Sequence, residues 1–307
     1  MDDRQIISLR GKKNPVDPKK PYAFIHEKEL SASGVIEEVA TIFLTNSECP
    51  FKCLMCDLWL NTTDKPVKKG EIPKQIHWAL NHLPSCERIK LYNSGNFFDK
   101  KAIPPEDYAE IVNLLKGFKS VIVECHPRLI DRSCLDFAAM LDQELEVAIG
   151  LETVNPDILP LLNKRMDLVD FKESVAFLKE NGIQTRAFIL LKPPYLSEHK
   201  SVYWAKRSID YAFECGVNCC CVIPTRTGNG ALDRLKDRGL FSEPSIYSLE
   251  EVLEYGINLK TGRVFADIWD LERFSSCNKC VKQRKHRLNQ MNLTQEILPE
   301  IDCTCNS

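Results

Sequence analysis

The stretch that decides the fold is Cys49-Pro50-Phe51-Lys52-Cys53-Leu54-Met55-Cys56, in which three cysteines follow the spacing C-x3-C-x2-C. It follows the β-type run 39–44 (VATIFL), so the sequence predicts a short loop after a strand. Three thiolates on one loop can hold three irons of a cubane cluster and leave the fourth iron open. A structural zinc ion takes four ligands, and the nearest further candidate, His77, lies about twenty residues on. The triplet therefore favours a [4Fe-4S] cluster held by Cys49, Cys53 and Cys56.

The sequence after the cysteine loop alternates β-branched runs with stretches of helical periodicity, which is the pattern of repeated βα units around a parallel sheet. Six strands are predicted, at 38–44, 88–93, 120–125, 145–151, 184–191 and 217–223. Helices are predicted near 74–83, 105–117, 131–141, 155–163, 168–181 and 198–215. A run ending in Asn181-Gly182 stops one helix directly before the fifth strand. The predicted fold class is α/β, a partial (β/α)6 TIM-like barrel with a C-terminal cysteine-rich extension.

Composition divides the chain into three predicted parts. Residues 1–35, with Lys12, Lys13, Lys19, Lys20 and three prolines, are expected to form an N-terminal arm, and residues 36–262 the partial barrel. Residues 263–307 form the C-terminal extension, which begins with one more predicted strand at 263–270. Four cysteines of the extension are grouped in two pairs, Cys277 and Cys280, then Cys303 and Cys305. Four thiols suffice for a tetrahedral zinc ion or an auxiliary iron-sulfur cluster, and both possibilities stay open.

The cysteine triplet resembles the signature of the radical S-adenosylmethionine (radical SAM) superfamily, in which a bulky apolar or aromatic residue precedes the third cysteine. Met55 fills that place. With NSGNFFD (93–99), ECHP (124–127), GLET (150–153), TRAFILLKPP (185–194) and PTRTGNGALDRL (224–235), the triplet is similar to the archaeosine-synthase radical SAM subunit and its bacterial relatives, in the Elongator-catalytic-subunit and MiaB-like group. The resemblance covers the chain from about residue 41 to the end.

This resemblance implies an activity. The cluster would supply one electron to S-adenosyl-L-methionine (SAM), and homolysis of SAM would give a 5'-deoxyadenosyl radical that abstracts hydrogen from a substrate. The substrate implied is a modified nucleoside of the 7-deazaguanine type in tRNA. An electron donor such as flavodoxin or ferredoxin is expected, and a partner subunit is possible.

The carboxyl ends of the strands are where such barrels carry their chemistry, and these ends are polar here. The resemblance implies SAM contacts from Asn93, Ser94, Gly95, Asn96, Glu124, Glu152, Arg186 and Thr225. The run 93–96 stands where the superfamily has a Gly-Gly-Glu-like motif for the methionine amino group. Because glycine and glutamate are replaced, Ser94 and Asn96 would act as neutral substitutes, or the run is an ordinary turn.

Four of these residues each have two possible roles. Glu124 and Glu152 emerge from apolar strands, where burial of a carboxylate is costly unless it has a partner or a functional role. They would either contact SAM or the substrate, or form ion pairs with Arg186 or Arg128. Arg186 would hold the methionine carboxylate by a bidentate bond, or form a salt bridge at the barrel bottom. Thr225 would line the adenine or meet the substrate.

The charge balance limits where RNA can bind. The chain has 41 Lys and Arg against 43 Asp and Glu, so any basic surface must be local. The run 282–288 on a predicted helix is either a solvated face or a phosphate-contacting patch, with tRNA contacts through Lys282, Arg284, Lys285 and Arg287. No apolar run approaches the roughly 18 residues that span a bilayer, and the start lacks a signal-peptide segment, so a cytoplasmic protein without membrane contact is expected.

Two other functions stay open at this stage. One is radical SAM chemistry on a small metabolite or peptide. The other is a non-catalytic, metal-dependent interaction protein. The intact triplet and the polar strand ends favour an enzyme, since a barrel without catalysis would need no open iron.

Overall fold

The protein is described here by a computed structural model that covers residues 1–303 and 305. Its centre is one sheet of eight strands, ordered β1 to β8 along the sheet as along the chain. The strands are β1 (Ala23–Leu30), β2 (Ile36–Leu44), β3 (Arg88–Asn93), β4 (Ser120–Cys125), β5 (Glu144–Glu152), β6 (Gln184–Leu191), β7 (Cys219–Pro224) and β8 (Arg263–Ala266). β1 runs antiparallel to β2, and every later pair is parallel. This confirms the predicted α/β class with a sheet built from βα units.

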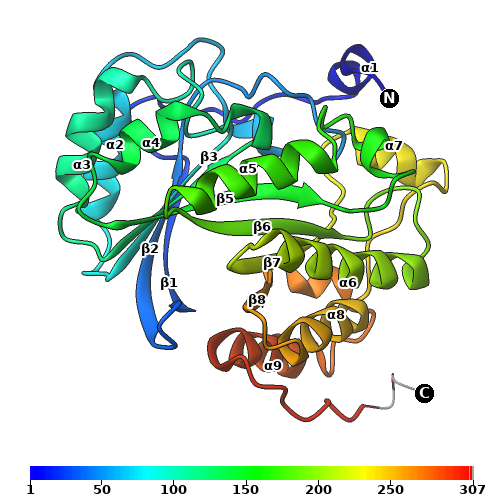
Figure 1. The fold of residues 1–307 in the computed structure, drawn as a ribbon. Coiled ribbons are helices and arrows are strands. Elements are labelled where there is room, and N and C mark those ends of the chain that lie inside the picture. The colour runs from blue at the N-terminus through cyan, green and yellow to red at the C-terminus, as the bar shows by residue number, and fades with distance from the viewer. Residues whose placement is uncertain (304, 306–307) are drawn as a thin grey trace.

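Helices follow the strands and cover the outer face of the curled sheet (Figure 1). They are α1 (Asp3–Ser8), α2 (Glu71–Leu80), α3 (Tyr108–Leu115), α4 (Arg132–Ala138), α5 (Leu168–Glu180), α6 (Glu198–Cys215), α7 (Ala231–Asp237), α8 (Ile246–Asn258) and α9 (Val281–Thr294). Among the residues the structure describes, no helix is long and apolar enough to cross a membrane.

The two faces of the sheet differ in chemistry because successive strand residues point to opposite sides. On β3, Ile89 and Leu91 point outward and join the hydrophobic core beneath the helices. Their neighbours Arg88 and Lys90 point into the barrel, where both are buried. The core therefore lies between sheet and helices, and the barrel interior is left for polar groups and a cavity.

An ion-pair network fills the amino-terminal end of the barrel. The Glu29 carboxylate lies 2.6 Å from both Lys90 Nζ and Arg186 Nη2. Arg186 Nε lies 2.6 Å from Glu146 Oε1 on the neighbouring strand. Burial alone would raise the pKa of Glu29, but Arg186 and Lys90 hold this pKa well below its usual range. The network closes the barrel bottom with compensated charges.

Several elements differ from the sequence-based expectations. The predicted arm 1–35 contains β1, which pairs with β2 along its whole length. The predicted helix 155–163 contains only the short 3-10 turn Leu159–Leu162. Two helices that the sequence did not suggest, α7 and α8, follow β7. The additional strand expected near 263–270 is present as β8.

The sheet is an open barrel, and α9 lies where its edges approach each other. Within the described residues, β1 and β8 are at opposite edges of the sheet and pair only with β2 and β7. Helix α9 packs against both edge strands. The C-terminal extension thus covers the gap between the first and last strands.

Candidate metal and cofactor site

A cavity of about 530 Å³ occupies the barrel interior. Cys49, Cys53 and Cys56 all line it, from the loop that follows β2. The strand-end residues Glu124 and Glu152 line it as well. The structure therefore brings the predicted cluster ligands and two of the predicted carboxylates to one space.

The cysteine loop is fixed by backbone contacts from distant parts of the chain. Leu54 N donates to Leu162 O at 2.8 Å. The Asn229 side chain donates to Leu54 O at 2.8 Å and to Cys56 O at 3.2 Å. Asn163 Nδ2 donates to Lys52 O at 2.8 Å. Because these bonds hold the loop backbone itself, the three thiols are positioned before any metal binds.

The thiols fit a metal cluster by their chemistry. Burial raises the pKa of Cys53 to about 12 and raises those of Cys49 and Cys56, so these groups are neutral thiols until a bound cation compensates the charge of the thiolates. Asn96 Nδ2 donates to Cys49 Sγ at 3.1 Å, and Asn96 Oδ1 accepts from His126 N at 2.6 Å. A donated hydrogen bond stabilises thiolate, which is the form that binds iron. Three sulfur donors that face one cavity match a cluster bound through three irons.

Glu152 lies at a distortion of β5. The register between β5 and β6 shifts between Gly150 and Glu152, and Glu152 has a left-handed φ of 64°. Its carboxylate pairs with the buried Lys164, which also lines the cavity. Sequence reasoning missed Lys164, because only the fold brings it beside this strand end.

Glu124 lies inside the cavity wall on β4. Its Oε1 accepts a hydrogen bond from Asn93 N at 2.6 Å. Burial raises the pKa of Glu124 to about 8, although the bond from Asn93 opposes this shift. The carboxyl is therefore mostly neutral at neutral pH and can donate as well as accept a hydrogen bond.

The run after β3 divides between two environments. Ser94, Gly95 and Asn96 line the cavity. A Cβ added to Gly95 would lie 2.9 Å from Asn46 Nδ2, so a larger residue here would displace the Asn46 side chain. The Asn93 side chain is buried and does not line the cavity. Within the described residues, its side-chain Nδ2 and Oδ1 atoms form no hydrogen bond.

Arg186 and Thr225 are engaged elsewhere. Arg186 lines the deep part of the cavity, but Glu29 and Glu146 both hold its guanidinium, as in the alternative of a barrel-bottom salt bridge. The Thr225 hydroxyl donates to Leu191 O at 2.9 Å, and its side chain does not appear among the described residues of the cavity wall. Neither geometry favours a direct SAM contact by these two residues.

The rim of the cavity adds residues that the sequence did not single out. Tyr22, from the predicted arm, lines the cavity beside the cysteine loop. Arg226 forms an ion pair with Asp267 at 2.5 Å, and Trp269, 53% exposed, lies next to them. Aromatic rings, including those of Phe43 and others on β6 and β8, form the walls. Tyr22 and Trp269 come from segments that have no motif of their own, whereas Arg226 lies within the run 224–235.

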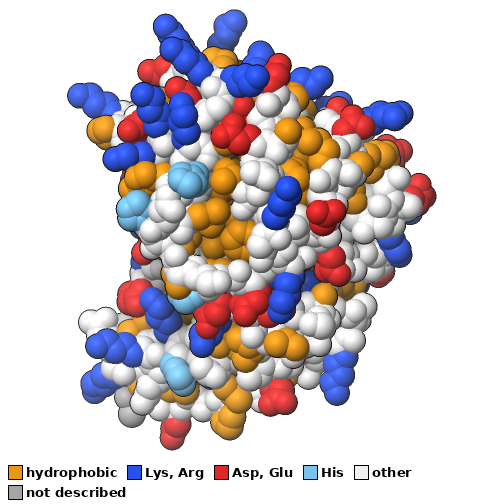
Figure 2. Space-filling model, turned by 90° about the vertical axis from the view of Figure 1, so that its left-hand side faces the viewer, with side chains coloured by type: hydrophobic (Ala, Val, Ile, Leu, Met, Phe, Trp, Pro, Cys, Tyr) orange, Lys and Arg blue, Asp and Glu red, His pale blue; other side chains and the backbone are white. Residues whose placement is uncertain are grey.

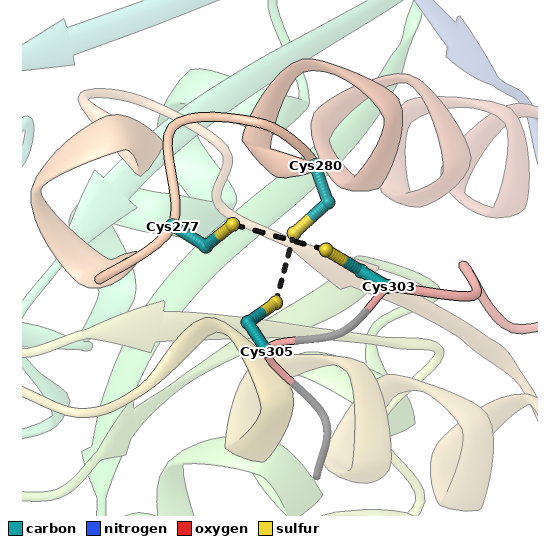
Figure 3. Close-up of side chains that lie close together, drawn as sticks. All are labelled: Cys277, Cys280, Cys303 and Cys305. Carbon is teal, nitrogen blue, oxygen red and sulfur yellow. Dashed lines mark hydrogen bonds between the residues drawn. The ribbon is translucent and has the colours of Figure 1, made fainter.

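The four C-terminal cysteines converge (Figure 3). Their sulfur atoms all lie within 4.8 Å of one another. The Sγ atoms of Cys277 and Cys303 are 3.8 Å apart, and those of Cys280 and Cys305 are 3.5 Å apart. Tyr247 Oη lies 3.1 Å from Cys305 Sγ. The pairs that the sequence grouped by spacing thus form one compact site between the start of α9 and the chain end.

The predicted phosphate-contacting patch on α9 is wrong for two of its four residues. Arg284 and Arg287 are only 2% and 3% exposed. Both pair with Glu250, and Arg287 also lies 2.6 Å from Glu254. These arginines fix α9 against α8, because α8 supplies the carboxylates. Lys282 and Lys285 alone remain at the surface, and Lys285 pairs there with a carboxylate.

Curated proteins similar in sequence come from archaea. An uncharacterized protein of Methanocaldococcus jannaschii is 23% identical over 320 residues, covering 96% of this chain and 87% of the relative. Archaeosine synthase subunit beta of Methanosarcina acetivorans is 26% identical over 266 residues, covering 80% and 75%. The same subunit of Thermococcus kodakarensis is 30% identical over 211 residues, covering 66% and 65%. No protein-family profile matches the chain.

Solved structures resemble the chain in fold. Elp3 from Methanocaldococcus infernus superposes with a TM-score of 0.54 at 14% identity, covering 75% of this chain and 56% of that longer chain. Coproporphyrinogen III oxidase from Escherichia coli, a radical SAM enzyme, superposes with a TM-score of 0.51 at 14% identity, covering 85% and 56%. The chain therefore has the fold of these radical SAM barrels and is similar in sequence to archaeosine synthase β subunits.

Proposed function

We propose that this protein is a radical SAM enzyme that binds a [4Fe-4S] cluster through Cys49, Cys53 and Cys56. The convergence of these three thiols on the barrel cavity is the observation that carries the proposal. When bound, the cluster would pass one electron, received from a donor such as flavodoxin or ferredoxin, to SAM, whose C5'–S bond would break to give methionine and a 5'-deoxyadenosyl radical. This radical would abstract a hydrogen atom from a substrate held in the same cavity.

The residues of the chain position SAM and exclude water. Ser94, Gly95 and Asn96 present polar and backbone groups beside the cysteine loop, where the methionine end of SAM belongs. Glu152, anchored by Lys164, and the mostly neutral Glu124 offer hydrogen-bonding groups for hydroxyls deeper in the cavity. The aromatic walls keep the reaction away from bulk water, which protects a radical from side reactions.

The proposed substrate is a modified nucleoside of the 7-deazaguanine type in tRNA. This part rests on the curated relatives, two of which are named archaeosine synthase subunit beta. The cavity volume of about 530 Å³ falls in the range that small-molecule sites occupy, so it can admit a reacting group together with part of SAM.

Cluster-dependent SAM cleavage tests this function. The protein is reconstituted anaerobically with iron and sulfide, reduced, and assayed for 5'-deoxyadenosine. Replacing Cys53 by alanine should abolish both the cluster absorption and the product, whereas replacing Cys86 by serine should change neither. Substrate identity is tested by adding tRNA that carries a modified 7-deazaguanine. Stimulation of product formation by this tRNA, and none by unmodified tRNA, is the expected result.

We further propose that the C-terminal site holds one zinc ion rather than an auxiliary cluster. A tetrahedral Zn–S distance of about 2.3 Å places neighbouring sulfurs about 3.8 Å apart. The observed Sγ separations of 3.8 Å and 3.5 Å are close to this sulfur–sulfur distance. In a [4Fe-4S] cluster each thiolate binds a different iron, and in a [2Fe-2S] cluster the four thiolates are divided between two irons. In both cases some of the sulfurs would have to lie further apart than the 4.8 Å within which all four lie here.

Metal analysis separates the two possibilities. The wild-type protein should retain about one zinc per chain after its iron has been removed with a mild chelator. Replacing Cys277 by serine should lower the zinc content and leave the iron of the barrel cluster unchanged. Iron above four atoms per chain in the reconstituted protein, lost in the Cys277 variant, would contradict the zinc assignment.

A further inference from the structure

The upper part of the molecule carries a concentration of lysines (Figure 2). Three segments, 11–20, 62–74 and 98–101, contain ten lysines and four carboxylates, although the whole chain is slightly acidic. We call these three segments the lysine surface. Nine of its ten lysines are exposed. Among the residues the structure describes, Lys13 alone of the ten forms a salt bridge.

The three segments form one surface because hydrogen bonds tie them together. The first segment meets the second where Lys13 Nζ lies 2.9 Å from Asp64 Oδ1. It also meets α2, where Gln75 Nε2 donates to Pro18 O at 2.7 Å. The third segment is held to the loop after β2 by Ser47 Oγ, which donates to Lys101 O at 2.8 Å. The lysines therefore stand on a fixed backbone.

The carboxylates of these segments are too few to neutralise the lysine surface, because four negative charges stand against ten positive ones. Asp64 is paired with Lys13. The other three each accept a backbone N–H bond within their own segment: Asp17 from Lys19, Glu71 from Lys68 and Asp99 from Lys101. Exposed ammonium groups without carboxylate partners attract polyanions, and phosphodiester backbones are the polyanions that such a surface suits.

The lysine surface adjoins the candidate active site. The second segment follows the cysteine loop, which ends at Cys56, within a few residues. The third segment begins two residues after Asn96, whose amide contacts Cys49 Sγ. The basic run on α9, in contrast, has its two arginines buried against α8. The lysine surface is therefore connected through short chain segments to the cysteine loop and to Asn96.

We propose that the lysine surface binds the phosphate backbone of the RNA substrate and so orients the reacting nucleoside toward the cavity. This inference rests on the proposed function, since it takes RNA as the substrate. It assigns RNA contacts to residues outside the helix that sequence reasoning had selected.

Removal of four lysine charges tests the proposal. Lys65, Lys68, Lys69 and Lys101 are replaced together by glutamine in the full-length protein, and binding to unfractionated tRNA is measured against salt. Each phosphate contact contributes about 0.7 to 0.9 to the slope of log affinity against log salt, which is about five- to eightfold in affinity at 0.1 M. Loss of two or more contacts should weaken binding at least about 25-fold and make the salt dependence shallower.

The matched control removes the same charge elsewhere. Replacement of the exposed Lys172, Lys200, Lys236 and Lys260 by glutamine changes net charge equally and should leave affinity and slope close to the wild-type values. Equal tRNA binding by the lysine-surface variant and the wild-type protein, or an equal loss in the control, would overturn the proposal.

SAM cleavage without RNA is measured on the same three proteins. Formation of 5'-deoxyadenosine by all three, with tRNA binding lost only in the lysine-surface variant, is the expected pattern. Absence of 5'-deoxyadenosine even in the wild-type protein would refute the proposed function. The tRNA-binding measurements would then still show whether the lysine surface binds RNA. Unchanged unfolding temperatures show that the substitutions leave the fold intact.

Discussion

The partly buried carboxyl of Glu124 makes the stability of the fold depend on pH in a direction that can be worked out. Burial raises its pKa from 4.5 to about 8. Between these two values the folded protein keeps a proton that the unfolded chain releases, so stability falls as pH rises. Each pKa unit corresponds to about 1.4 kcal/mol, so ionisation of Glu124 should cost about 3 to 4 kcal/mol between pH 5 and pH 8.

Replacement of Glu124 by glutamine removes this titration and keeps a carbonyl oxygen to accept the Asn93 N–H bond. Urea unfolding of the metal-free protein at pH 5 and pH 8 gives the free energy of unfolding at each pH. The variant should match the wild type most closely at pH 5 and exceed it at pH 8 by a few kcal/mol. Replacement of the exposed Glu180 by glutamine is the control. A constant difference between variant and wild type across this range would refute the assigned burial of the charge.

Three further predictions concern other parts of the molecule. Arg186→Gln leaves two buried carboxylates without their shared partner, so urea unfolding should show a loss of about 3 to 5 kcal/mol, and an unchanged midpoint would contradict the network. Asn96→Ala removes the hydrogen bond to Cys49 Sγ, so a redox titration of the reconstituted cluster should give a lower reduction potential; an equal potential would show that this bond does not reach the metal. Arg284 donates a hydrogen bond to Cys280 Sγ and pairs with Glu250, so Arg284→Met removes this bond and leaves the carboxylate unpaired. The C-terminal site of the variant should therefore release zinc to a chelator faster than that of the wild type. Equal release rates would show that Arg284 does not support the site.

Much of the barrel could be predicted from sequence because its strands are locally distinct. The predicted bounds of β3, β4 and β6 coincide with the observed ones. These strands are β-rich runs bounded by helix stops and turns. Strand β1 escaped prediction because its sequence, AFIHEKEL, has charged residues that look like those of a solvated segment. Glu29 is buried there only because cations from other strands surround it.

The site shows the same division between local and distant information. The cysteine triplet is a local motif, so its place on the barrel cavity could be predicted. Lys164 reaches Glu152 only through the distortion of β5 and the loop that follows, which no spacing rule reveals. Arg284 and Arg287 looked like surface charges because their carboxylate partners lie on α8, more than 30 positions away along the chain. Composition and periodicity do not reveal which distant segments of the chain pair with each other.

The central claim is that the three cavity thiols hold a cluster that cleaves SAM. Its most direct test is the amount of 5'-deoxyadenosine formed by the anaerobically reconstituted and reduced protein. The wild-type protein and the Cys86→Ser control should form product, and the Cys53→Ala variant should form none. Full iron loading of the cluster site without any 5'-deoxyadenosine would contradict it.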